Sequence, residues 1–565
     1  MLTSLPPFVI FYIGALLVVL SRGVVRRFVL IGTPIVGALT LIGAPTGITT
    51  ELAIFDYSLV LFRIDKLSLL FGYLFSIAAL ISVIYALHVR DTTQHVSALL
   101  YAGSALGAVF AGDLITLFLF WEMLALTSVF LIWARRTPRA LGAGFRYLVV
   151  QVVSGLLLLA GALLHYYESG SLTFERFALQ SVGPWLMLLA FGIKCAFPLL
   201  HNWLTDAYPE ATPTGTVFLS AFTTKVAVYA LARGFPGTEL LIYVGAIMTC
   251  FPIFYAVIEN DLRRVLAYSM INQIGFMVCG VGIGTELALN GAVSHAFNDV
   301  LFKGLLMMSM GAVLHRTGTI NGSELGGLYK SMPKTASLCI VGAASISAFP
   351  MFSGFVSKSM VMAATLDEGY QWVWLMLLFA SAGVFHHAGI KIPYFAFFAH
   401  DAGHRVSEAP TNMLIAMGLA AALCVFIGVY PWLLYDLLPF TVNYVPYDST
   451  HVIAQLQLLF FSALAFAWLK LSGIYPPELP SVNIDAEWIY RYAAPRTLPA
   501  VENYITAIDR RTRSWAMRGY RQLLAVVLHL GGPQSLLAST WSTGRMVFLC
   551  LGLLGLILVY NYWLR

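Results

Sequence analysis

The chain has 565 residues, enough for several soluble domains, but its composition excludes them. Hydrophobic residues make up 59% of the sequence and charged residues only 11%, which is typical of a polytopic membrane protein. The formal net charge of +6 comes largely from basic residues in short loops between apolar runs. It therefore indicates a positive-inside bias rather than binding to nucleic acid.

Apolar runs recur along the whole chain, each long enough to cross a hydrocarbon core of roughly 30 Å. Their period is helical and they are too long for barrel strands, so we expect an all-α polytopic membrane protein with about 14 to 16 transmembrane helices. The expected spans are residues 6–21, 28–48, 67–88, 96–112, 114–134, 140–166, 184–204, 212–233, 238–258, 262–284, 287–313, 335–366, 371–398, 412–435, 454–472 and 546–563. Residues 51–63 alternate in polarity, which predicts a hairpin or amphipathic strand pair outside the membrane.

The loop charges predict how the chain is oriented. Residues 6–21 follow no basic region and precede no small-residue cleavage site, so they are expected to be a retained span. If the N-terminus lies outside, the basic residues divide unequally between the two sides. The inner loops then hold Arg22, Arg26, Arg27, Arg90, Arg135, Arg136, Arg139, Arg263, Arg264, Arg316, Lys330, Lys334 and Arg405. The outer loops hold only Arg63, Lys66, Arg176 and Arg233. This asymmetry predicts a multi-pass protein of the inner (plasma) membrane.

The stretch from 473 to 545 differs from the rest in being aromatic and of mixed charge. We expect an amphipathic helix at the inner membrane surface, followed by a last span. The six cysteines are scattered through apolar runs without a C-x-x-C pair, so an iron–sulfur or zinc site is not expected. With no nucleotide, haem or metal motif, the sequence predicts no cofactor and no metal, and favours a transporter over an enzyme.

Two lysines lie where a membrane-spanning helix tolerates charge least. Lys194 precedes Pro198 within one apolar run, and Lys225 lies in the middle of the next. A charge at membrane depth is costly unless it is paired or hydrated, so each lysine predicts a functional site. Lys358 follows Pro350 in a second proline-interrupted run five spans later. The odd offset gives the two runs opposite directions, which indicates two inverted five-helix repeats, each with a broken helix.

Other titratable residues complete the candidate set. Glu122 is central in its span; it marks an ion path or is a neutral acid hydrogen-bonded to a neighbouring helix. His295, Asp299 and Lys303 are spaced i, i+4, i+8 on one helix face, as a proton wire or a polar seam between helices requires.

Three further residues are weaker candidates. His387 and Lys391 repeat the i, i+4 spacing, although Lys391 could extend its amine to the nearby membrane surface. His201, with Asp206 and Glu210, suits a proton entrance or an ordinary solvated loop.

Several motifs resemble one family of membrane subunits. FGIKCAFPLLHNWLTDAYPEATPTGTVFLSAFTTK, ENDLRRVLAYSMINQIGFMVCG, SHAFNDVLFKGLLMM and FPMFSGFVSK occur in the family's order. They are similar to the antiporter-like subunits of respiratory complex I and of Mrp-type multisubunit Na⁺/H⁺ antiporters, most of all the D-type subunits of the latter. The resemblance covers roughly residues 60–430.

The resemblance implies roles for the candidate residues. Glu122 and Lys194 correspond to a glutamate–lysine pair that modulates proton release. Lys225 corresponds to the lysine of the next helix, Lys303 to the central lysine, and Lys358 to the terminal lysine of the second broken helix. The chain departs from the family at Asp299, where many relatives have a histidine, and at the amides Asn272 and Gln273.

The function implied is a proton-translocating subunit of a multisubunit monovalent cation/proton antiporter, with other membrane subunits and the lipid bilayer as partners and H⁺ and Na⁺ as ions. Alternatives are a proton-pumping subunit of a complex I-like oxidoreductase or membrane-bound hydrogenase, an energising subunit for inorganic-carbon uptake, and a structural scaffold. The expected organisation is N-terminal helices and hairpin (1–95), first repeat (96–234), second repeat (238–400), C-terminal helices (401–472), cytoplasmic amphipathic segment (473–545) and terminal helix (546–565).

Overall fold

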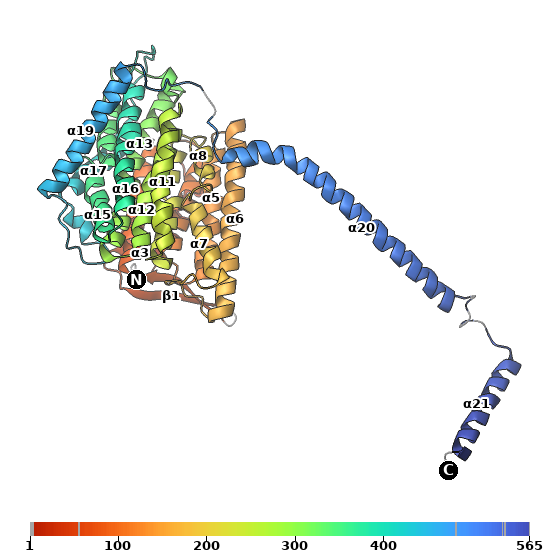
Figure 1. Cartoon of the computed structure of the whole chain (residues 1–565). Coiled ribbons are helices and arrows are strands. Elements are labelled where there is room, and N and C mark those ends of the chain that lie inside the picture. The colour runs from red at the N-terminus through yellow and green to blue at the C-terminus, as the bar shows by residue number, and fades with distance from the viewer. Residues whose placement is uncertain are drawn as a thin grey trace. The chain divides into compact units, whose positions relative to one another are not determined.

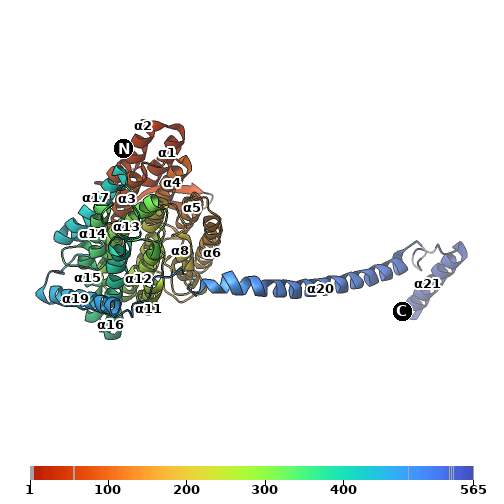
Figure 2. The same cartoon turned by 90° about the horizontal axis from the view of Figure 1, so that it is seen from above.

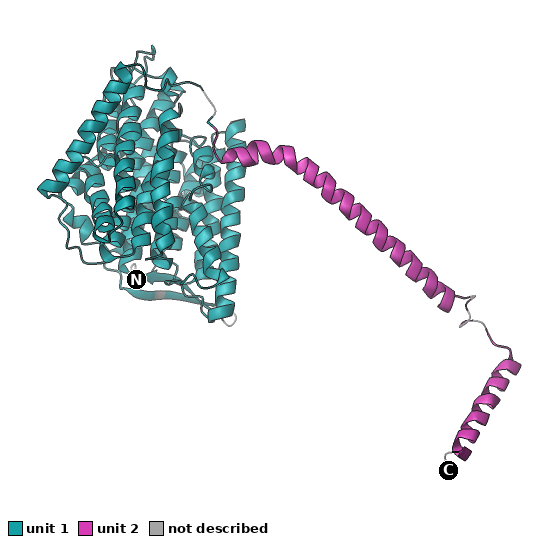
Figure 3. Cartoon of the chain, viewed as in Figure 1, with its two compact units in different colours: residues 1–483 teal, residues 484–565 magenta. Residues whose placement is uncertain are grey.

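The computed structural model describes residues 5–54, 57–480, 483–533, 535, 538 and 540–563. The chain divides into two compact units, Met1–Asn483 and Ile484–Arg565, which Figure 3 colours separately.

The first unit is a bundle of helices that stand side by side (Figure 1). Seen from above, α1 and α2 lie at one edge and α16 and α19 at the opposite edge (Figure 2). The helices are α1 (Pro7–Leu20), α2 (Gly23–Leu41), α3 (Lys66–Ala86), α4 (Thr92–Phe110), α5 (Leu114–Trp133), α6 (Pro138–Ser169), α7 (Val182–Lys194), α8 (Asn202–Ala207), α9 (Gly215–Ala221), α10 (Thr223–Gly234), α11 (Glu239–Ile258), α12 (Leu262–Ile283), α13 (Glu286–Thr317), α14 (Pro333–Ile346), α15 (Ser353–Asp367), α16 (Gln371–Val384), α17 (Thr411–Val429), α18 (Trp432–Tyr435) and α19 (Ser449–Leu471), with a 3-10 turn η2 (Gly322–Glu324) and two π-helical segments, η3 (Phe385–Lys391) and η4 (Tyr394–Phe398).

Twelve helical stretches among the described residues are long and apolar enough to cross a membrane. The all-α membrane fold predicted from the sequence is therefore confirmed. The number of 14 to 16 spans stays a prediction, because interrupted spans such as α7–α8 and α14–α15 divide into helices shorter than 18 residues.

The predicted hairpin is present. Strands β1 (Gly47–Ile54) and β2 (Tyr57–Ile64) pair antiparallel, while the connecting residues 55 and 56 lie outside the described part of the chain. The backbone of Val60 binds the start of α5 through two hydrogen bonds, from its N–H to Asp113 Oδ2 (2.7 Å) and from Gly112 N–H to its carbonyl (2.9 Å). The hairpin thus fastens α3 to the loop between α4 and α5.

The two halves of the bundle share several local features. Asp113 and Asp261 are the N-caps of α5 and α12, and each forms an isolated backbone bridge, to Thr173 and Asn321 respectively. Each of these two capped helices is followed by a 32-residue helix, α6 or α13, which ends at a glycine in the left-handed conformation. A broken helix follows in both halves. These correspondences support the two repeats expected from the sequence.

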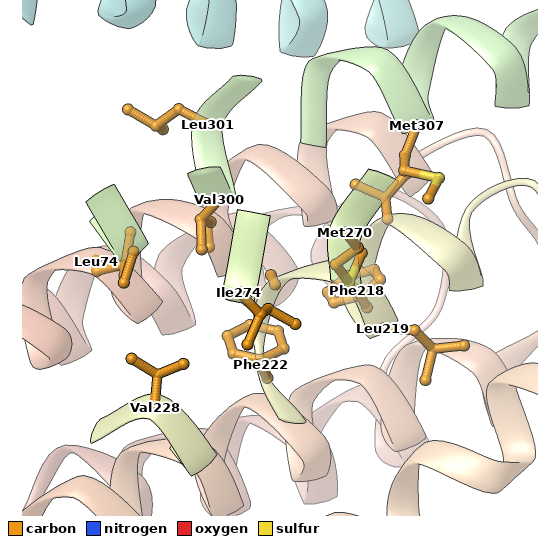
Figure 4. Close-up of a cluster of buried hydrophobic side chains, with 14 of the residues drawn as sticks. Leu74, Phe218, Leu219, Phe222, Val228, Met270, Ile274, Val300, Leu301 and Met307 are labelled. Atoms are coloured by element: carbon orange, nitrogen blue, oxygen red, sulfur yellow. The ribbon is translucent and has the colours of Figure 1, made fainter. Parts of the chain in front are cut away.

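Helix α13 lies at the centre of the bundle and is buried along nearly its whole length. It packs against α12, α14, α15 and α17, and also against α9 and α10 of the first half. Apolar side chains fill the space around it, among them Phe222, Met270 and Ile274 (Figure 4). These closely packed apolar side chains surround the polar groups of α13 and limit where ions can move.

The second unit contains a π-helical segment η5 (Ile489–Ala493), a 38-residue helix α20 (Ala494–Gly531) and α21 (Thr543–Trp563). A helix is therefore present in each of the two predicted stretches, and α21 is long and apolar enough to cross a membrane. The position of α20 at a membrane surface stays a prediction.

Candidate functional site

The first broken helix is interrupted between Lys194 and Asn202. Ala196 and Leu199 adopt positive φ angles of 59° and 68°, which non-glycine residues rarely take and which cost free energy. Pro198 cannot supply a backbone donor, so a regular helix cannot continue through this turn. Lys194 is the last residue of α7 and is fully buried.

The second broken helix repeats this geometry. Ala348 and Met351 have φ angles of 56° and 73°, and both breaks have the local sequence Ala-Phe-Pro followed by a large apolar residue. Lys358, on the far side of the break in α15, donates from Nζ to the carbonyl of Ile346 (3.2 Å), the last residue of α14. The break thus supplies a backbone acceptor to a buried amine.

The side chains of Lys194 and Glu122 lie near each other without forming a hydrogen bond. Nζ of Lys194 donates to the backbone carbonyl of Trp121 (2.6 Å) and lies 4.5 Å from the centroid of the Trp121 ring. The two charges interact electrostatically, but no ion pair joins them in the part of the chain that the structure describes. Oε1 of Glu122 is buried, and no described residue forms a hydrogen bond with it.

Helix α6 approaches Glu122 closely at a glycine. A Cβ atom on Gly155 would lie 1.4 Å from Oε1 and 2.5 Å from Cδ of Glu122. One residue earlier, Ser154 accepts a hydrogen bond from Trp121 Nε1 (3.0 Å) and donates to the Ala190 carbonyl (2.8 Å). Helices α5, α6 and α7 therefore meet where Glu122 and Lys194 lie, and no signal in the sequence indicated that Gly155 makes room there.

The predicted residues Lys225 and Asp299 form a direct ion pair. Lys225 Nζ lies 2.6 Å from Asp299 Oδ2, and both side chains are fully buried. The run from α9 to α10 is interrupted at Phe222, and Lys225 also donates to the carbonyl of Ser220 (3.3 Å). Because Lys225 belongs to the first half and Asp299 to the second, this pair joins the two halves.

Asp299 is an electrostatic neighbour of two more predicted lysines. Its charge acts on Lys303 and Lys358 as well as on Lys225. Lys303, one turn further along α13, donates from Nζ to Ser269 Oγ of α12 (2.8 Å). The carboxylate therefore lies among three buried amines from α10, α13 and α15.

His295 belongs to a chain of hydrogen bonds formed with hydroxyl and amide side chains. Its Nδ1 lies 3.0 Å from Ser357 Oγ, and its Nε2 lies 2.9 Å from Gln273 Oε1. Gln273 donates in turn to Asn272 Oδ1 (2.8 Å), and Asn272 donates to the carbonyl of Thr249. The amides that distinguish this chain from the family pattern thus hold the ring of His295, and both ring nitrogens have partners.

The three weaker candidates, His201, His387 and Lys391, lie outside the helices that carry the residues described above. His201 directly precedes α8, as its N-cap residue, and packs against the rings of Phe251 and Tyr268. His387 and Lys391 lie in η3, and both are fully buried. Lys391 forms an ion pair with Glu478 (2.9 Å), a residue that no sequence signal pointed to because it follows a proline pair after the last bundle helix.

One arginine counted with the inner loops is not exposed. Arg263 lies in the first turn of α12 and is fully buried. Its guanidinium donates to the carbonyls of Pro209, Ala211 and Thr212 at 3.1–3.2 Å. Arginine is suited to this because its planar fork of donors can satisfy several acceptors at once.

Buried amines, carboxylates and a histidine lie inside a bundle of membrane-length helices, and charged groups at membrane depth mark candidate ion paths. Residues 111–386 match the family described as NADH:quinone oxidoreductase/Mrp antiporter, TM. Over this range, a little under half of its length, the chain is similar to that family.

Curated relatives cover the chain in part. It is 29% identical over 433 residues to hydrogenase-4 component B of Escherichia coli (strain K12), covering 66% of this chain and 63% of that protein. It is 32% identical over 285 residues to the D-type subunit of the Na(+)/H(+) antiporter of Alkalihalophilus pseudofirmus, covering 47% of this chain and 58% of that one. The chain thus spans between about half and two thirds of the length of the curated relatives it matches.

Two solved structures share the fold. A chain of the Mrp complex from Dietzia sp. DQ12-45-1b aligns with a TM-score of 0.69 at 22% identity, covering 80% of this chain and 99% of that chain. A chain of the membrane-bound sulfane sulfur reductase, an archaeal respiratory membrane complex, aligns with a TM-score of 0.72 at 22% identity, covering 98% of this chain and all (100%) of that one.

Proposed function

We propose that this chain is the proton-translocating subunit of a multisubunit monovalent cation/proton (Na⁺/H⁺) antiporter. The observation that carries the proposal is the buried Lys225–Asp299 ion pair, which connects the titratable groups of the first half with those of the second. A scaffold would gain nothing from burying these charges, because their desolvation costs free energy that well-packed apolar side chains would not.

The proposed path begins at the inner end of the first half, which comprises residues 96–234. A proton reaches Lys194 and then Lys225, crosses by Asp299, His295 and Lys303, and leaves to the outside near Lys358 in the second half, residues 238–400. Lysine suits such a path because burial disfavours its charged form, so an amine can release and regain a proton as a neighbouring carboxylate approaches or withdraws. Glu122 has this role for Lys194.

The amines can be tested directly. Lys194→Ala and Lys303→Ala should abolish ΔpH-driven Na⁺ exchange in inverted membrane vesicles, because each variant removes a proton carrier. Lys334→Ala, which changes an exposed lysine at the N-terminus of α14, should keep the wild-type rate. Membrane content of each variant is measured in parallel, and wild-type exchange in Lys194→Ala or Lys303→Ala would remove that residue from the path.

The proposed orientation places the N-terminus outside the plasma membrane. Arg136 and Ser169 are exposed and flank α6, whose 32 residues span about 48 Å. In a background with the exposed Cys550 changed to serine, Arg136→Cys should react with an impermeant maleimide only from the cytoplasmic side, and Ser169→Cys only from the outside. The opposite pattern would reverse the direction of the proton path.

A second candidate function is a proton-pumping subunit of a redox-driven complex. The observation that favours it is the extent of the likeness to the archaeal respiratory subunit, which covers 98% of this chain, whereas the Mrp subunit covers 80%. Either function places the chain among other membrane subunits. Mild solubilisation and identification of the copurified subunits separates the two, since flavin- or iron–sulfur-binding partners would identify the redox-driven complex.

A further inference from the structure

A second buried charge pair lies where α11 ends, and the proposed path does not use it. Lys391 is the last residue of η3, and its ammonium lies 2.9 Å from the carboxylate of Glu478. The Lys391 side chain is fully buried, and only 5% of the Glu478 side chain is exposed.

The end of α11 holds the ammonium. Lys391 Nζ donates to the carbonyls of Ala256 (3.2 Å), Val257 (2.7 Å) and Glu259 (2.7 Å). The last carbonyls of a helix have no partner within it and lie at the negative end of its dipole, so they favour a cation. The arrangement fixes the amine near the end of α11 that we propose faces the cytoplasm.

Glu478 is brought to Lys391 by the segment that follows α19. Tyr475 anchors this segment against the rings of Phe395 and Phe466, and Asn483 donates to Glu259 Oε2 (3.1 Å). These contacts hold the segment in place without any help from Glu478. They therefore do not explain why its carboxylate is buried, which costs desolvation free energy. Burial raises the pKa of Glu478, while the charges of Lys391 and Lys470 oppose this rise and that of Glu259 adds to it.

His387 is an electrostatic neighbour of both this pair and the central helix α13. It lies four residues before Lys391 in the same π-helical segment, and it interacts electrostatically with both Lys303 and Lys391. The segment η3 packs against α11, α12, α14 and α19, so it lies between the central polar line and the segment that carries Glu478. Single π-helical turns inside helices occur frequently at functional sites.

We infer that Glu478, Lys391 and His387 form a second proton entrance, which leads from the inner end of the bundle to Lys303. Lys391 passes a proton from its ammonium to the imidazole of His387, which becomes an imidazolium and passes a proton to the neutral amine of Lys303. The neutral Lys391 takes a proton from the carboxylic acid of Glu478, and the resulting carboxylate takes one from water at the inner surface. This entrance rests on the proposed function, because it supplies the same central line.

Four variants of the full-length chain in its native membrane test the entrance: Glu478→Gln, Glu478→Asp, Lys391→Met and the double variant Lys391→Met/Glu478→Gln. Glu324→Gln is the matched control, since Glu324 lies in η2 near Glu478 and its carboxylate accepts hydrogen bonds from the neighbouring loop residues Thr319 and Asn321. Na⁺-driven ΔpH changes in inverted vesicles and thermal stability after solubilisation are measured for each variant.

If Glu478 and Lys391 form a proton entrance, their double variant should lose transport without losing thermal stability. The double variant should be as stable as the control yet transport about tenfold more slowly, since a positioned acid or base contributes on the order of 10²–10⁴-fold to proton transfer and the first entrance remains open. Glu478→Asp, which keeps the acid, should transport faster than Glu478→Gln. Transport that follows thermal stability across the four variants would show a structural contact only and overturn the inference. Lys303→Ala in the same assay tests the proposed function separately, since its failure to block transport would contradict that function whatever the Glu478 variants do.

Discussion

Removing one member of the Lys225–Asp299 pair is expected to destabilise the protein by about 3–5 kcal/mol, whereas removing both should cost less than the sum of the two single losses. Lys225→Met takes away the amine that is paired directly with Asp299, and Asp299→Asn leaves the Lys225 ammonium buried without its carboxylate. Both side chains are fully buried, so neither remaining charge can turn to water. The double variant Lys225→Met/Asp299→Asn removes both charges and keeps similar side-chain volumes.

A double-mutant cycle in thermal stability measures the coupling between the two residues. The exposed pair Arg405–Asp401 is the control, and its cycle should show little coupling because solvent screens it. Transport should stay lost in the double variant, since the proton carriers are gone. Additive effects of Lys225→Met and Asp299→Asn would show that the pair does not hold the two halves together, and wild-type transport in the double variant would remove both residues from the path.

The sequence predicted most of the fold because its signals are local. Each span is an apolar run of helical length, and the two breaks lie beside Pro198 and Pro350, which lack a backbone N–H donor. The i, i+4 spacing likewise placed Asp299 and Lys303 on one face of α13. None of these inferences needed to know which helices are neighbours.

Partners across the bundle could not be predicted, because they depend on how helices from distant parts of the chain pack. The sequence placed Lys225 and Asp299 in separate helices without indicating that they meet. It also could not show that a residue after α19 returns to neutralise Lys391. The burial of Arg263 could not be predicted for the same reason, since a basic residue beside a loop resembles a solvated one until the loop folds over it.

The expected Glu122–Lys194 contact shows the limit of spacing arguments. The structure brings the two side chains near enough to interact electrostatically, yet the amine is hydrogen-bonded to the Trp121 carbonyl and the carboxylate lies against Gly155. Coupling between the two charges should therefore be weaker than that of Lys225 with Asp299. It depends on where the Glu122 carboxylate is held, and α6 determines that position.

Gly155→Ala is accordingly expected to remove most transport while leaving the protein folded. A glycine inside a helix costs about 0.5–1 kcal/mol relative to alanine, so the substitution should by itself stabilise α6 slightly. The added Cβ would, however, lie 1.4 Å from Glu122 Oε1, and the flexible carboxylate must move away. Lys194 would then lose the position of its modulating charge. Na⁺-driven ΔpH changes in inverted vesicles, with thermal stability measured in parallel, test this expectation.

Gly142→Ala is the matched control on the same helix, because a Cβ there lies near a single atom, Nη1 of Arg146, at 3.3 Å. It should leave transport unchanged while stabilising α6 slightly, as alanine in place of a helical glycine does. Glu122→Asp in the Gly155→Ala background should recover part of the transport, since the shorter side chain withdraws its carboxylate from the new methyl group while keeping the charge. A Gly155→Ala variant with wild-type transport would show that Glu122 acts from another position than the one it occupies beside α6. Loss of transport without recovery by Glu122→Asp would instead indicate that α6 itself, rather than the carboxylate, is displaced by the methyl group.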